Sequence, residues 1–251
     1  MKRLFILLVL LSMGAGLKAQ VLNVESLRKV TDTSGLSGYV GVNFSLIRNV
    51  NEFVVLGSDI LLQYKMNDHL VLLKNDIRFL KIEGEDFANN GITHLRYNYR
   101  FHPRIRWEVF AQAQYNRVAL IDFRGLLGTG PRFKLTDKEK YKFYLGTLVM
   151  YEYEELADGV TPINRDIRGS AYLSFSLYPS ERVTIVSTTY YQPLFKQFSD
   201  FRISSDSTLA VELLKPLSLT VSYQFFYDPF PAVGIPTSQY NFTTGLTYSF
   251  D

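Results

Sequence analysis

The chain is 251 residues long, and 47% of its residues are hydrophobic and 15% aromatic, which excludes an intrinsically disordered protein. It contains no cysteine, which excludes disulfides, thiolate metal sites, a cysteine nucleophile and a cysteine-linked lipid anchor. The formal net charge is +3, but Lys2, Arg3 and Lys18 lie in a segment predicted to be removed, which leaves 24 basic against 24 acidic residues. A neutral mature protein gives no reason to expect binding to nucleic acid.

The first 19 residues have the layout of a secretory signal peptide. The positively charged Lys2 and Arg3 precede an apolar run over Leu4–Leu11, and small residues lead to Ala19, after which we expect cleavage. The alternative is an uncleaved anchor helix, but the apolar run is shorter than the ~20 residues that span a bilayer. The sequence therefore predicts export, followed by a periplasmic lead-in over residues 20–36.

From residue 37 to the end, the main pattern is an alternation of apolar and polar residues, which is typical of strands with two different faces. Turn residues divide this part into twelve predicted strands. They cover residues 37–48, 53–65, 69–82, 91–101, 104–121, 124–136, 141–154, 166–178, 182–194, 199–214, 217–228 and 237–250. The pattern indicates a single all-β domain over residues 37–251, without a helix longer than one turn.

The predicted connections between strands differ in length on the two ends of the sheet. The connections at one end are all short, namely residues 66–68, 102–103, 136–140, 179–182 and 215–216. Three connections at the other end are long, namely residues 83–90, 155–165 and 229–236. Short turns on one side and longer loops on the other are typical of an outer-membrane barrel. The predicted fold is a single antiparallel transmembrane β-barrel of about twelve strands, with both termini in the periplasm.

Alternation alone does not decide which face points outward. Twelve strands closed into one barrel enclose more space than side chains fill, so an inward apolar face would line a large cavity. We therefore expect the apolar face to meet lipid and the polar face to line a hydrated interior. The alternative is a secreted β-sandwich in which two apolar faces pack together. The lengths of the connections and the C-terminal sequence favour the barrel.

The C-terminal sequence resembles the assembly signal of bacterial outer-membrane barrels. Gly245, Tyr248 and Phe250 form the pattern of a glycine followed by two aromatic residues two positions apart. The resemblance implies recognition by the barrel-assembly machinery. One departure is Asp251, which follows the aromatic residue at which the pattern usually ends.

Several stretches of the mature chain resemble the domain of unknown function 481 family, described as salt-induced outer-membrane proteins, in its Bacteroidetes-type form. The stretches are Asn23–Ser26, Gly35–Gly38, Val42–Ile47, Asn49–Asn51, Gly84–Phe87, Asn90–Gly91, His94–Tyr99 and Gly128–Phe133. The resemblance covers roughly Asn23 to Phe250. It implies an outer-membrane barrel of a Gram-negative bacterium, without an assigned chemistry and without catalytic residues.

The candidate functional residues are the charged side chains of the predicted inner face, selected by their parity along each strand. They are Lys74, Asp76, Arg78, Arg96, Arg100, Arg106, Glu108, Arg132, Lys134, Lys142, Arg168, Arg202, Asp206 and Glu212. Basic residues outnumber acidic ones, which favours anions if the interior is a passive pore for small polar solutes. The alternative is a structural, stress-responsive barrel in which opposite charges pair and close the interior.

Other motifs predict no enzyme and no cofactor. His94 is followed two positions later by Arg96 and not by the serine that an outer-membrane phospholipase would place there. The glycines of Gly125–Gly130 are followed by a strand pattern and not by the helix that a phosphate loop needs. The expected partners are outer-membrane lipid, lipopolysaccharide and the assembly machinery, and no pattern indicates an oligomeric state.

Two acidic clusters fall at the ends of predicted long loops. They are Glu83, Glu85 and Asp86, and Glu152, Glu154, Glu155 and Asp158. They could bind Ca²⁺ or bridge lipopolysaccharide through a divalent ion, although the spacing is not that of an EF-hand. A solvated outer loop is the interpretation that we favour.

Overall fold

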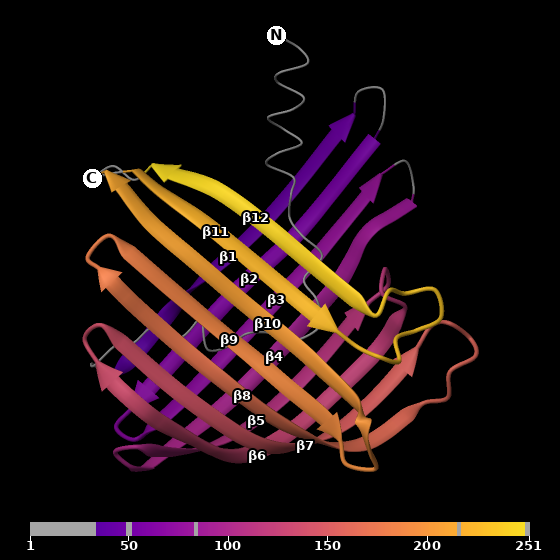
Figure 1. Ribbon diagram of the computed structural model, residues 1–251. Helices are drawn as coiled ribbons and strands as arrows, with labels where there is room; N and C mark the ends of the chain where they lie inside the picture. The colour runs from indigo at the N-terminus through magenta and orange to yellow at the C-terminus, as the bar shows by residue number, and fades with distance from the viewer. Residues whose placement is uncertain (1–33, 49–51, 83–84, 215–216, 249–251) are drawn as a thin grey trace.

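The computed structural model describes residues 34–48, 52–82, 85–214 and 217–248, which form twelve strands (Figure 1). The strands are β1 (Gly35–Arg48), β2 (Glu52–Met66), β3 (His69–Ile82), β4 (Glu85–His102), β5 (Ile105–Asn116), β6 (Ile121–Lys138), β7 (Tyr141–Leu156), β8 (Asn164–Ser180), β9 (Val183–Leu194), β10 (Gln197–Leu214), β11 (Leu217–Tyr227) and β12 (Ser238–Tyr248). In the described part of the chain, no helix is long and apolar enough to cross a membrane. The predicted signal peptide and most of the lead-in lie outside the described residues.

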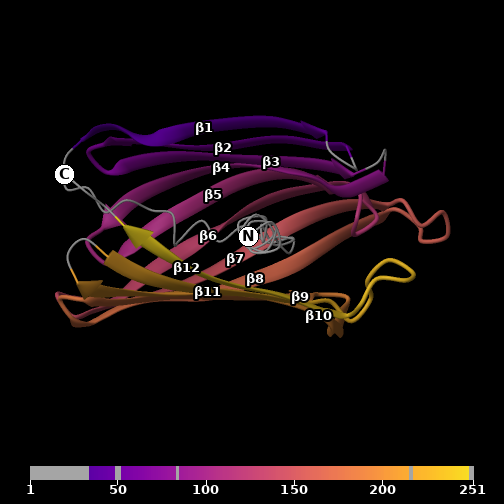
Figure 2. The same cartoon turned by 90° about the horizontal axis from the view of Figure 1, so that it is seen from above.

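All twelve strands belong to one antiparallel sheet in which each strand pairs with its neighbours in sequence. The prediction of an all-β fold with twelve antiparallel strands is therefore confirmed. The sheet curls so that β1–β5 and β8–β12 face each other (Figure 2). Among the described residues β1 and β12 do not pair with each other, so the curled sheet keeps two edges.

The two ends of the sheet differ as expected. Two-residue turns join β2 to β3, β4 to β5, β6 to β7 and β8 to β9. In the first of these turns Asn67 adopts φ 50°, a left-handed conformation that asparagine tolerates better than most residues. The first residues of β1 pair near this turn, and the last residues of β12 pair with the start of β11. Both ends of the described chain therefore lie at the short-turn end.

One predicted long loop is wrong. Residues 85–90 were expected in a loop, but β4 begins at Glu85. The sequence Asn89-Asn90-Gly91 has the composition of a turn, yet these residues pair with Phe79, Arg78 and Ile77 of β3. Pairing with a long partner strand therefore overrides local turn propensity here. The longer connections among the described residues are 117–120, 157–163 and 228–237.

The two faces of the sheet differ in chemistry as well as in exposure. All twelve strands carry large exposed apolar side chains, among them Val42, Phe44, Leu56, Ile77, Leu95, Trp107, Leu127, Val149, Leu173, Tyr191, Leu213, Tyr223 and Phe242. The alternating residues are buried, as Glu108 and Phe110 are on β5. The Tyr172 hydroxyl of β8 lies 2.7 Å from Oε2 of Glu108, although β6 and β7 separate their strands. Side chains meet across two intervening strands only on the concave face, so the buried face is the inner one.

The inner face is not uniformly polar, in contrast to the expectation. Apolar and aromatic side chains from β5 to β9 form a buried cluster of Phe110, Leu126, Leu148, Met150, Tyr172 and Tyr190. Two glycines make room for its rings. A Cβ at Gly146 would lie 2.0 Å from a ring carbon of Tyr172, and one at Gly128 would lie 2.3 Å from a ring carbon of Phe110. This part of the interior is therefore filled with side chains.

Candidate functional site

The charged residues selected by parity occupy the positions that alternate with the exposed apolar residues. Seven of the fourteen candidates are buried, namely Lys74, Asp76, Arg96, Glu108, Arg132, Arg168 and Arg202. Arg78, Arg106, Lys134 and Glu212 are partly exposed, and Arg100 is 44% exposed. Lys142 and Asp206 are also partly exposed. The structure brings the buried candidates together in three clusters.

The largest cluster is centred on Glu152 of β7, whose side chain has no exposed surface. Its carboxylate accepts a hydrogen bond of 2.6 Å from Nε of Arg124 and one of 2.5 Å from Nε of Arg168. Nη1 of Arg202 also bonds to it. Three guanidinium groups from β6, β8 and β10 therefore converge on one carboxylate. We call the arginines, with their carboxylate partners, the ionic network.

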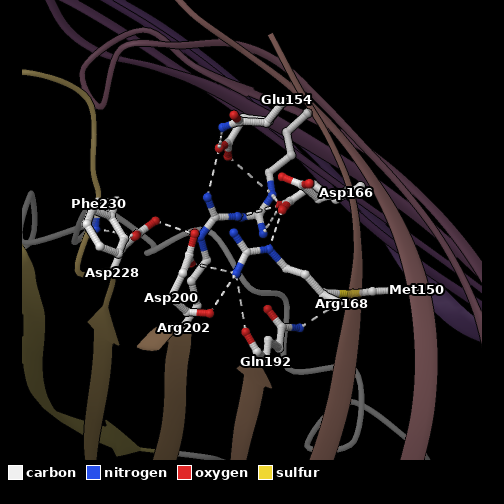
Figure 3. A network of polar contacts seen from close by, with 12 residues as sticks. Met150, Glu154, Asp166, Arg168, Gln192, Asp200, Arg202, Asp228 and Phe230 are labelled. Carbon is white, nitrogen blue, oxygen red and sulfur yellow. Dashed lines mark hydrogen bonds and ion pairs between the residues drawn. The ribbon is translucent and has the colours of Figure 1, made fainter. Parts of the chain in front are cut away.

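Arg202 also binds a second carboxylate of β7 and links the network to the end of β11 (Figure 3). Its Nη2 lies 2.7 Å from Oε1 of Glu154 on β7, and its Nε lies 2.6 Å from Oδ2 of Asp228 at the end of β11. Arg168 is held in the same way, since its Nη1 lies 2.8 Å from Oδ1 of Asp200. Three arginines are thus matched by the four carboxylates of residues 152, 154, 200 and 228. Buried charges are tolerated when they are paired and hydrogen-bonded in this way.

The second cluster surrounds Glu108. Besides the Tyr172 hydroxyl, its carboxylate has Nη1 of Arg96 at 3.5 Å and Nε of Arg132 at 3.9 Å. The guanidinium of Arg132 lies 3.9 Å from the ring centroid of Tyr144. In the third cluster, Lys74 forms ion pairs with Asp59 and, at 3.8 Å, with Asp76. The inner face thus holds fixed ion pairs at more than one height and on most of its circumference.

His94 is part of the polar packing of the inner face. Its Nδ1 lies 2.9 Å from Oε1 of Gln112, and its Nε2 accepts a hydrogen bond of 3.3 Å from Nε of Arg96. Both ring nitrogens are therefore engaged by side chains that are not nucleophiles. His69 lies on the outer face, where its Nδ1 is 2.7 Å from the Tyr97 hydroxyl. These contacts give no support to a serine–histidine hydrolase.

The interpretation of Glu152 and Glu154 as solvated loop residues is wrong. β7 continues to Leu156, and both carboxylates point inward in phase with Leu148 and Met150. Glu155 and Asp158 remain outside the network. Among the described side chains, no group of three or more acidic or histidine residues is arranged to hold a metal ion. The other acidic cluster, Glu83, Glu85 and Asp86, lies outside the part of the chain whose side chains the structure describes.

Five members of the network were not predicted to lie on the inner face, namely Arg124, Glu152, Glu154, Asp200 and Asp228. For Arg124, Glu152 and Glu154, parity with Leu126 and Met150 was the available signal, but the glycine-rich stretch and the acidic run concealed it. Asp228 follows the last residue of β11, and alternation does not extend to it. Of the C-terminal motif, Gly245 lies on β12 opposite Thr220, and the backbone of Tyr248 pairs with Leu217. Phe250 lies outside the described residues.

A curled antiparallel sheet with an apolar outer face and an ion-paired inner face defines a protein of the β-barrel class. The chain belongs to the family described as "Protein of unknown function, DUF481", whose model matches residues 51–250. No curated protein matches it in sequence.

Solved structures resemble the chain at low identity. A NanC porin structure has 8% identity and a TM-score of 0.46, with 86% of this chain and 98% of that chain covered. A bacterial polysaccharide outer-membrane secretin has 8% identity and a TM-score of 0.44, with 86% and 91% covered. OccK11 (OpdR) of Pseudomonas aeruginosa has 10% identity and a TM-score of 0.38, with 84% and 65% covered.

Proposed function

We propose that the chain is an outer-membrane β-barrel protein with a lipid-facing outer surface and an interior closed by ion pairs, without catalytic activity. The observation that carries this proposal is the convergence of Arg124, Arg168 and Arg202 on Glu152, which ties β6, β7, β8 and β10 together. A wide water-filled pore would leave these side chains solvated. Their burial supports a structural wall component over a passive pore.

The outer face supports a membrane location. Exposed apolar side chains occur on every strand, far beyond the apolar patch of a few hundred Å² that a water-soluble monomer tolerates. Aromatic side chains occur towards both ends of the strands, as in the girdles of outer-membrane barrels. Tyr64, Tyr99 and Trp107 lie towards the short turns, while Phe44 and Phe123 lie towards the other end. Together with the expected export signal, this supports the outer membrane and contact with its lipids.

The lipid contact can be tested because the chain has no cysteine, so single cysteines can be labelled specifically. Leu127→Cys places a probe on the outer face of β6, at a side chain that is 58% exposed. Val160→Cys is the matched control in the loop between β7 and β8. In liposomes, brominated lipid should quench an environment-sensitive dye at position 127 and not at 160. Quenching of position 127 by aqueous iodide alone would contradict a lipid-facing surface.

The closed interior is tested by liposome swelling. Folded protein should give no swelling with arabinose, an amino acid or phosphate above that of empty liposomes, and no steps of wide-pore conductance in planar bilayers. Rapid swelling would overturn the closed interior and would support the second candidate, a passive pore. The observation that favours a passive pore is the charge of the inner face near the short turns.

A further inference from the structure

A short row of hydrogen-bonded polar side chains crosses the outer face of β2, β3 and β4. The Ser58 hydroxyl donates a hydrogen bond of 3.1 Å to Oδ1 of Asn75, and Nδ2 of Asn75 donates one of 2.8 Å to the Thr93 hydroxyl. Asn75 lies between the buried, inward-pointing Lys74 and Asp76, so its own side chain points outward. We call Ser58, Asn75 and Thr93 the polar ladder.

The polar ladder lies at mid-height of the apolar outer face. Asn75 is the seventh of the 14 residues of β3, and a tilted strand needs only about 9–11 residues to cross the hydrocarbon region. Leu56, Ile77 and Leu95 lie two positions from the ladder along the same strands and are 44%, 37% and 48% exposed. In a barrel that spans the membrane, the ladder is therefore an island of hydrogen-bonding groups at the depth of the lipid tails. The inference below rests on the proposed function for this placement.

The amide of Asn75 differs from the other polar side chains of the outer face. On β9 and β10, the hydroxyls of Ser187 and Ser207 pair at 2.8 Å, and those of Thr189 and Ser205 pair at 2.9 Å. A hydroxyl has one O–H to donate, whereas a side-chain amide has two N–H donors and an oxygen with two lone pairs. Among the described residues, the polar ladder engages one N–H and one lone pair of Asn75. The amide can therefore form further hydrogen bonds, which lipid tails cannot supply.

We propose that the polar ladder is the contact through which a second copy of the chain binds within the membrane. Copies inserted in the same direction can be related by a twofold axis along the membrane normal, and such an axis brings groups of equal depth together. Asn75 then faces Asn75 of the second copy. Two amides satisfy each other because each offers both a donor and an acceptor. Lipid headgroups also form hydrogen bonds, but they lie at the bilayer surface and not at this depth.

The apolar side chains beside the polar ladder complete the contact. Leu56, Ile77 and Leu95 would pack against the same residues of the second copy, and the amides at the centre would fix how the two copies are aligned. Association of membrane-spanning segments is driven by this combination of close packing and hydrogen bonds between polar side chains.

The test is energy transfer between labelled copies in liposomes. Donor and acceptor dyes are attached to Val160→Cys in the loop between β7 and β8, since the chain has no other cysteine. Transfer in this parent protein should persist on dilution with lipid, and Asn75→Leu should weaken association at least tenfold. The matched control is Thr189→Val, which removes an outward hydroxyl from β9 and should leave association unchanged. Transfer at the level of random proximity in the parent protein, or equal association of the two variants, would overturn the proposal.

Cross-linking locates the contact. A short bifunctional maleimide should join two copies of Ile77→Cys, which lies beside the polar ladder, but not two copies of Leu127→Cys on β6. Equal cross-linking at the two positions would contradict a contact through β2–β4.

Two controls separate this proposal from its alternatives. A heat-dependent gel shift verifies that Asn75→Leu is folded, and easier unfolding with unchanged association would show that the ladder only braces the sheet, which also overturns the proposal. Quenching by brominated lipid at position 127 does not depend on association. Quenching without energy transfer would therefore leave the lipid-facing surface intact and exclude the second copy.

Discussion

At the scale of single residues, Glu152 is the buried carboxylate on which three arginines converge. Its two oxygens accept hydrogen bonds from three arginines, and its side chain has no contact with solvent. Such a buried carboxylate is compatible with a stable fold only when it is fully paired, because an uncompensated buried charge strongly destabilises the folded state. Changes to it should therefore affect the whole molecule more than changes to any carboxylate at a turn.

Glu152→Gln should lower the free energy of unfolding by about 3–5 kcal/mol, because three buried guanidinium groups lose their common negative partner. The measurement is urea unfolding in detergent micelles, followed by tryptophan fluorescence. Glu139→Gln is the control, since Glu139 is exposed in the turn between β6 and β7 and should change stability by less than about 0.5 kcal/mol. Equal effects of the two variants would show that the network does not stabilise the fold.

Gly146→Ala should destabilise the barrel by about 1–3 kcal/mol, since the new methyl group would overlap the Tyr172 ring. Displacement of that ring would also break its hydrogen bond to Glu108. Gly41→Ala is the control, because its Cβ would be in ordinary contact at 3.5 Å from a backbone oxygen. The same unfolding experiment measures both variants. A Gly146→Ala protein as stable as the control would mean that the ring is free to move.

At the scale of elements, two loops at one end of the barrel are joined through Asp158. Its carboxylate accepts hydrogen bonds from the hydroxyl of Thr161 at 2.5 Å and from the backbone N–H groups of Thr161 and Val160. The backbone N–H of Val233, in the loop between β11 and β12, donates to it at 3.3 Å. These hydrogen bonds, that of the Thr161 hydroxyl above all, lower the pKa of Asp158 from 3.8 to about 2.

The lowered pKa predicts that the two loops separate only in strong acid. The contribution of the ionised carboxylate is complete above pH 3.8 and is lost as the pH falls through about 2. Pepsin cleavage within residues 157–163, normalised to a reference substrate, should therefore increase as the pH is lowered from 4 to 1.5. Asp158→Asn, which cannot gain this proton, should show a much weaker dependence on pH. A wild-type loop cleaved at the same rate throughout would contradict the prediction.

Most strands could be predicted from the alternation of apolar and polar residues, because the two faces of each strand lie in different environments. The errors fall where local composition and tertiary pairing disagree. Asn89-Asn90-Gly91 has turn composition, but the long strand β3 supplies partners for it. The acidic end of β7 has loop composition, but arginines from β6, β8 and β10 make its burial favourable. Such contacts connect residues 16 to 50 positions apart, so no local pattern records them.

At the scale of the whole molecule, support from side chains is distributed unevenly around the sheet. The buried cluster and the ionic network connect β5 to β10, whereas many residues of β1 and β12 are among the most exposed. Amide hydrogen exchange should therefore be slowest in β6–β8 and fastest in β1 and β12. Mass spectrometry of peptides from the detergent-solubilised protein measures this directly. Uniform protection across all twelve strands would show that the interior contacts do not determine local stability.

Among the described residues, β1 and β12 are the two edge strands of the curled sheet, and this affects how the protein can sit in a bilayer. Lipid tails offer no hydrogen bonds, so the outer N–H and C=O groups of β1 and β12 need a protein partner. The two edge strands, which have the least support from interior side chains, are thus also the strands whose backbone groups most need hydrogen-bond partners. If the barrel opens sideways to admit a lipid or another strand, we expect it to open between β1 and β12, away from the strands β5–β10 that the buried cluster and the ionic network connect.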